Sequence, residues 1–183
     1  MKTIATIFLL SVLFTTALFA QTPVALNGVL TVKNGKIVNK NGTPPQLRGI
    51  SFSWSLWQGR KYYNPAVVDW LASDFKASII RASMGVQPDH GYLQEPALQK
   101  QLIVNVVDQA IKDGIYVLID WHDHHSNQHL PQSKEFFAEM AKKYKDVPNV
   151  IYEIWNEPEA ISWDTVKKLR GAGNYRDQKI RSG

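Results

Sequence analysis

One short stretch near the carboxyl end of the sequence contains residue types suited to acid/base chemistry. Residues 150–155 form a mainly apolar run, and Asn156, Glu157 and Pro158 follow it directly. A carboxyl group can donate and accept a proton, and burial beside Trp155 would favour its protonated form. The neighbouring amide can hydrogen-bond a hydroxyl group. We therefore predict that Glu157 is a general acid/base and that Asn156 binds substrate.

Two further polar residues lie at comparable points along the chain. Arg81 stands near the end of the expected strand 78–82, and His122 follows the expected strand 115–120. The carboxyl ends of neighbouring parallel strands meet at one rim, so these side chains would converge with Glu157. A single arginine at a strand end is more often a salt-bridge partner. The agreement of several positions favours a shared site.

A second carboxylate would decide the reaction type. Glycoside hydrolysis with retention of configuration needs two carboxyl groups about 5 Å apart. Glu153 precedes Glu157 by four residues, which is roughly 13 Å along an extended strand. We therefore expect Glu153 not to be the partner. Asp89, Glu95 and Asp123 lie on expected loops and could serve only if the loops were distorted, so we expect the partner to be missing from this chain.

The segment 121–125 contains three histidines and has two interpretations. His122 and His124 could begin the site of a metal-dependent hydrolase. Alternatively, His122 hydrogen-bonds substrate while the other histidines shape the loop. The second interpretation is favoured, because a His-x-His metal motif normally follows the first strand of a barrel and this one follows the third.

Aromatic residues gather in the loops after the first two expected strands. Trp54, Trp57, Tyr62 and Tyr63 follow the first strand, and Tyr92 follows the second. Any one ring is more often a packing residue. As a group on the expected rim, these rings indicate stacking against sugar rings, and we include Trp57 and Tyr92 among the predicted substrate-binding residues.

The hydrophobic pattern predicts the elements that would position these residues. A hairpin is expected over 29–38, because Asn34-Gly35 suits a tight turn. Strands are expected at 47–51, 78–82, 115–120 and 150–155, with helices at 65–75, 96–113, 133–145 and after Ser162. The fold class is therefore α/β, with a hairpin followed by about four β/α units of a partial (β/α)₈ TIM barrel. The alternative, an open doubly wound sheet, would need a glycine-rich first turn that the sequence lacks.

The ends of the chain differ from its middle. Residues 1–20 have the pattern of a secretory signal peptide, so we expect a secreted protein, extracellular or periplasmic, with no membrane segment after cleavage. The sequence has no cysteine, which excludes disulfides and thiolate catalysis. Six Lys or Arg residues and one Asp lie in 167–183, so this tail carries a net charge of +5, equal to that of the whole chain. We therefore expect no nucleic-acid partner, and the oligomeric state is left open.

With these residues in place, the chain resembles the amino-terminal half of a glycoside hydrolase family 5 cellulase, an endo-β-1,4-glucanase. The stretches that carry the resemblance are 47–51, 79–84, 117–122 and 150–158, within a region of about 29–168. The resemblance implies a (β/α)₈ barrel, a retaining two-carboxylate mechanism, a β-glucan substrate and no cofactor.

The resemblance also implies roles for individual residues. Glu157 matches the proton donor and acid/base, and Asn156 matches the residue that binds the sugar 2-hydroxyl. Arg81 matches the arginine beside the nucleophile, His122 a substrate-contacting histidine, and Trp57 the stacking residue of a distal glucose subsite. The family's nucleophile is a second glutamate on the seventh strand, and no residue of this chain corresponds to it. Some members have a tyrosine at the position of Gly85 in this chain.

The resemblance ends before the chain does. We expect 21–168 to be half of a catalytic domain and 169–183 to be an atypical basic tail, which a shifted reading frame would explain. A chain truncated before its nucleophile is expected to be inactive alone. The alternatives are a non-catalytic glucan-binding remnant and the metal-dependent hydrolase.

Overall fold

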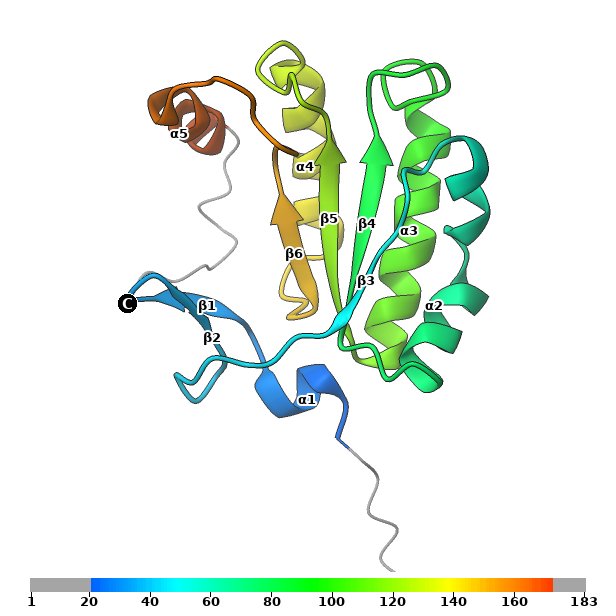
Figure 1. Ribbon diagram of the computed structural model, residues 1–183, viewed down its shortest axis with the longest axis vertical. Coiled ribbons are helices and arrows are strands. Elements are labelled where there is room, and N and C mark those ends of the chain that lie inside the picture. The colour runs from blue at the N-terminus through cyan, green and yellow to red at the C-terminus, as the bar shows by residue number, and fades with distance from the viewer. Residues whose placement is uncertain (1–20, 173–183) are drawn as a thin grey trace, which may run out of the picture.

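Four parallel strands form the central sheet of the computed structural model, which describes residues 21–172 (Figure 1). Their order in the sheet follows their order in the chain, as in consecutive β/α units. The strands are β3 (Gly49–Ser51), β4 (Ile79–Gly85), β5 (Tyr116–His122) and β6 (Val150–Glu153). This arrangement confirms the α/β class and the parallel sheet. Within the described residues the sheet is open, with β3 and β6 at its edges.

Helices follow the strands, and the two that connect β4 to β5 and β5 to β6 pack against one face of the sheet (Figure 1). The helices are the 3₁₀ helix η1 (Trp57–Tyr62), α2 (Pro65–Ser73), α3 (Pro96–Asp113), α4 (Leu130–Lys143) and α5 (Trp163–Ala172). The Asn64 side chain caps α2 by accepting from the backbone N–H of Val67, and Gly114 ends α3 in the left-handed region. No helix of the described part of the chain is long and apolar enough to span a membrane.

Alternate residues of the strands give the sheet two chemically different faces. On the face toward α3 and α4, the strand side chains are apolar and fully buried; they are Ile80, Ala82, Met84, Val117, Ile119 and Trp121. The opposite face carries polar residues, because Arg81, Ser83, Asp120, His122 and Glu153 have the other parity. In a barrel this polar face would line the interior.

The amino-terminal hairpin is confirmed. Strands β1 (Thr31–Lys33) and β2 (Lys36–Val38) pair in antiparallel fashion, and both turn residues, Asn34 and Gly35, have positive φ angles of 51° and 72°. Two positive φ angles are the signature of the turn that suits right-twisted strands. A short helix that the sequence did not predict, α1 (Pro23–Asn27), precedes the hairpin. Both lie at the amino end of the sheet strands (Figure 1).

Several expected boundaries were wrong by a few residues. Strand β4 continues to Gly85, so Arg81 is its third residue and does not end it. The fourth strand stops at Glu153, two residues before the expected end. Helix α4 starts at Leu130, three residues early. The expected signal peptide and residues 173–183 of the basic tail lie outside the described residues.

Candidate active site

Arg81 is the centre of a polar cluster on the inner face of the sheet. Its Nε and Nη2 atoms donate to the two carboxylate oxygens of Glu153 at 2.8 and 2.9 Å. The same side chain lies 2.9 Å from Asp120 and donates to Asn156 Oδ1 at 2.8 Å. A guanidinium group can hold several acceptors in a fixed plane. One residue of β4 thereby binds groups on β5, on β6 and in the loop that follows β6.

Asp120 links this cluster to His122. The Asp120 carboxylate is fully buried and lies 2.6 Å from His122 Nδ1. Burial raises the pKa of Asp120, while the hydrogen bond from His122 and the charge of Arg81 act in the opposite direction. A carboxylate accepts hydrogen bonds, so the contact assigns the proton to Nδ1 and leaves Nε2 as an acceptor in the neutral ring.

Asn156 is buried, and one half of its amide has a fixed partner. Because Oδ1 accepts from Arg81, the orientation of the amide group is set. The Nδ2 group makes no hydrogen bond within the described residues, and neither does the Oδ1 atom of Asp120. Buried polar atoms normally have partners. These two atoms are therefore buried polar groups whose hydrogen-bonding capacity is not used by the described residues.

Glu157 follows Asn156 but is not desolvated as the sequence suggested. Its side chain is 77% exposed, and its backbone has a φ angle of +44°. The indole ring of Trp155 is buried and donates to the carbonyl oxygen of His124 at 2.9 Å, so it is tied to the loop after β5. Within the described residues, the Glu157 carboxylate is therefore open to solvent at the carboxyl end of β6.

Two tryptophans extend the polar cluster along the rim. Trp54 packs edge-on against His122 with ring centroids 4.6 Å apart, and it stacks on Trp57 at 5.6 Å. Trp57 is 65% exposed. An exposed indole face beside hydrogen-bonding groups suits a sugar ring. The buried Leu56 occupies the space beside Gly85, since a Cβ at Gly85 would lie 2.6 Å from Leu56 Cγ.

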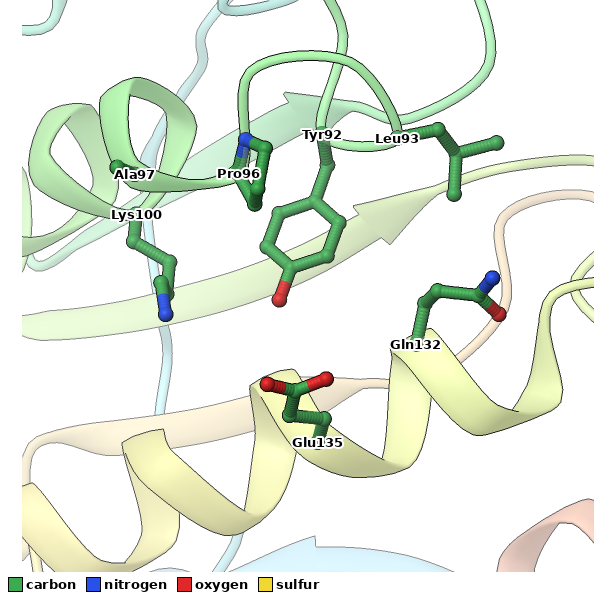
Figure 2. Close-up of a pocket in the computed structure, with 7 residues that line it drawn as sticks. All are labelled: Tyr92, Leu93, Pro96, Ala97, Lys100, Gln132 and Glu135. Carbon is green, nitrogen blue, oxygen red and sulfur yellow. The ribbon is translucent and has the colours of Figure 1, made fainter.

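Tyr92 does not lie with the other predicted residues. Its ring packs against Trp121 and Phe136 on the helix-covered face of the sheet. Figure 2 shows its hydroxyl pointing toward Glu135, in a cavity of about 370 Å³ between α3 and α4. Burial raises the pKa of Tyr92 to about 12. This placement offers no support for a role of Tyr92 at the rim.

The metal interpretation finds no support in the arrangement of the histidines. The His122 and His124 ring centroids are 6.3 Å apart, and Nδ1 of His122 is engaged with Asp120. Among the described residues, no group of three His, Cys, Asp or Glu residues is placed to hold a metal ion.

The sequence interpretation did not assign a role to Asp120 or Glu153 in the cluster. Both have the parity of the inner face, and Asp120 lies two residues before His122. The sequence could have predicted this cluster, because two acidic residues share the inward parity of Arg81 on neighbouring strands. Glu153 was considered only as a nucleophile and instead binds Arg81.

Comparison with known proteins gives a consistent result. The family model "Cellulase (glycosyl hydrolase family 5)" matches residues 38–174. Endoglucanase Z of Dickeya dadantii is 43% identical over 137 residues, which are 74% of this chain and 32% of the relative. A solved structure from Cytophaga hutchinsonii has a TM-score of 0.75 and 43% identity, with 84% of this chain and 53% of that chain covered.

A second solved structure is the catalytic domain of Thermobifida fusca endoglucanase Cel5A in complex with cellotetraose. It has a TM-score of 0.78 and 34% identity, and 86% of this chain aligns with 53% of that one. The chain thus spans about half of the solved structures and about a third of the curated relative. The matching region contains Arg81, His122, Asn156 and Glu157. The chain belongs to glycosyl hydrolase family 5, the cellulase family.

Proposed function

We propose that this chain forms part of the catalytic domain of a retaining endo-β-1,4-glucanase. The observation that carries the proposal is the buried Asn156 amide, which Arg81 orients and whose Nδ2 group has no partner in the described residues, directly beside the exposed Glu157. Relatives named endoglucanases, and a related catalytic domain solved with cellotetraose, support a β-1,4-glucan as the substrate.

The proposed mechanism assigns each rim residue a step. Glu157 protonates the leaving glycosidic oxygen and afterwards removes a proton from the attacking water. Asn156 donates from Nδ2 to a sugar hydroxyl. His122 offers Nε2 to a second hydroxyl, because Asp120 engages its Nδ1 atom. Arg81 fixes the Asn156 amide, and we propose that its positive charge stabilises the carboxylate of the nucleophile.

A retaining mechanism also needs a nucleophilic carboxylate about 5 Å from the acid/base. Neither of the two inner-face carboxylates described above suits this role. Asp120 is fully buried, and Glu153 accepts hydrogen bonds from Nε and Nη2 of Arg81. We propose that the nucleophile belongs to a part of the barrel beyond the four described strands. The described residues alone are accordingly expected to release no reducing sugar.

Complementation tests this proposal. The full chain would be co-expressed with the carboxyl-terminal half of the catalytic domain of Dickeya dadantii endoglucanase Z; we call the pair the complemented chain. Reducing-sugar release from carboxymethyl cellulose should appear only when both halves are present, and NMR of the first product should show the β-anomer. Failure of the halves to associate, or association without hydrolysis, would contradict the proposed function. Cellulose retention without turnover would favour a glucan-binding remnant.

Trp57 provides a separate test of the sugar-binding rim. Replacing Trp57 by alanine removes the exposed indole face, and we expect the affinity of the complemented chain for cellotetraose to fall about tenfold, or about 1.4 kcal/mol. Isothermal titration calorimetry measures the change. Trp70→Ala is the matched control, because Trp70 is 51% exposed on α2 and makes its ring contact with Phe75. Equal losses in both variants would argue against sugar stacking on Trp57.

Export is also proposed, on the basis of the apolar pattern of residues 1–20. Expression of the full chain in a Gram-negative host should give a periplasmic or extracellular product whose first residue lies at or within two residues of Gln21. Amino-terminal sequencing of the product measures this. A cytoplasmic product that starts at Met1 would contradict export.

A further inference from the structure

The loop between β5 and α4 brings a histidine to the proposed acid/base. His124 Nδ1 lies 3.5 Å from the carbonyl oxygen of Glu157 and 3.8 Å from its Oε2 atom. The same ring nitrogen therefore faces both the backbone and the side-chain acceptor of one residue. Such contacts are often long in a free enzyme and shorten when substrate binds.

The backbone at Glu157 needs support from its surroundings. Its φ angle of +44° lies in the left-handed region, which is unfavourable for a residue other than glycine. Pro158 follows and has no backbone N–H to contribute. On the other side of Asn156, the Trp155 indole donates to the His124 carbonyl oxygen at 2.9 Å. Residue 124 thus contacts the 155–157 segment at two points, through its backbone and through its ring.

The position of His124 is itself set by a buried group. The Asp123 side chain is fully buried and accepts from the backbone N–H of His125 at 2.8 Å. Its Oδ2 atom lies 2.7 Å from His129 Nδ1, at the start of α4, and accepts from the Trp121 indole at 3.3 Å. These contacts tie the loop to β5 and to α4. The loop that carries His124 is therefore held in place by the contacts of Asp123.

We infer that His124 is a positioning residue for Glu157. The imidazole holds the left-handed turn by donating from Nδ1 to the carbonyl oxygen of Glu157, and its contact with Oε2 at 3.8 Å keeps the carboxyl group directed over the rim. This inference rests on the proposed role of Glu157 as acid/base. His124 was one of the two ligands in the metal interpretation, and here it has a positioning role instead.

The test separates positioning of an acid from general support of the fold. In the complemented chain, His124→Ala should lower kcat/KM for cellotetraose by about 10- to 100-fold, part of the 10²–10⁴ of general acid catalysis. It should change kcat/KM for 2,4-dinitrophenyl cellobioside less than about threefold, because that leaving group departs without a proton. His124→Asn, whose amide nitrogen can take the place of Nδ1, should recover most of the loss on cellotetraose.

A control variant and two further outcomes decide between positioning of Glu157 and a general effect on the fold. His125→Ala is the control, since His125 is exposed and its side chain makes no hydrogen bond or ion pair to the described part of the chain; it should leave both rates unchanged. Equal loss on both substrates in His124→Ala, or no loss on either, would overturn the inference about His124 while leaving the proposed function standing. If Glu157→Gln retains full activity on cellotetraose, or the complemented chain is inactive, the proposed function fails and the inference fails with it.

Discussion

Replacing Glu157 by glutamine is expected to lower kcat/KM of the complemented chain for cellotetraose by about 10²- to 10⁴-fold. Glutamine keeps the size and the hydrogen-bonding capacity of the side chain but cannot deliver a proton to the leaving oxygen. The Glu157 side chain is 77% exposed and makes few contacts, so stability should change little. Initial rates of cellobiose release, measured by chromatography, give the ratio.

Glu159→Gln is the matched control for this substitution. Glu159 lies two residues further along the same turn and is exposed. It should retain the parent rate within about twofold, as is usual for surface positions without special contacts. A Glu157→Gln variant as active as Glu159→Gln would remove the acid/base assignment, whatever the fold of the complemented chain.

Replacing Arg81 by methionine is expected to lower the free energy of unfolding of the full chain by about 3 kcal/mol at pH 7. The variant leaves the buried Asp120 without its cation, and it leaves Glu153 without the paired hydrogen bonds. Urea unfolding followed by circular dichroism measures the loss. Arg48→Met is the control, since Arg48 is exposed and its side chain makes no ion pair within the described residues.

The loss in Arg81→Met should depend on pH with a definite sign. Burial raises the pKa of Asp120 above its ordinary value of 3.8, and the charge of Arg81 opposes that shift. Without Arg81 the pKa of Asp120 rises further. The folded state then takes up a proton at a higher pH than the unfolded state does, and acid favours the folded state in that interval. The deficit should be smaller at pH 5 than at pH 7, and an equal deficit at both values would contradict this account.

Local sequence signals predicted the elements that depend on neighbouring residues. Asn34-Gly35 predicted the hairpin because its positive φ angles are a local preference. The apolar spacing in 96–113 predicted α3 with its boundaries, and Gly114 marked its end. The parallel order β3 to β6 followed from apolar strands separated by helices.

Details that depend on the direction of side chains were less predictable. Sequence placed Tyr92 in a rim loop, but only the packing against Trp121 shows that its ring lies on the helix side. Proximity to Trp155 suggested a desolvated Glu157, yet its side chain is 77% exposed and its backbone has a positive φ angle. Arg81 was placed at a strand end, whereas its length allows it to reach the site from the third residue of β4.

The most direct test of the central claim is a crystal structure of the complemented chain with cellotetraose. The account predicts a sugar ring over Trp57, a sugar hydroxyl within hydrogen-bonding distance of Asn156 Nδ2, and a glycosidic oxygen about 3 Å from the Glu157 carboxyl group. An oligosaccharide bound away from this rim, for example in the cavity beside Tyr92 between α3 and α4 (Figure 2), would contradict it.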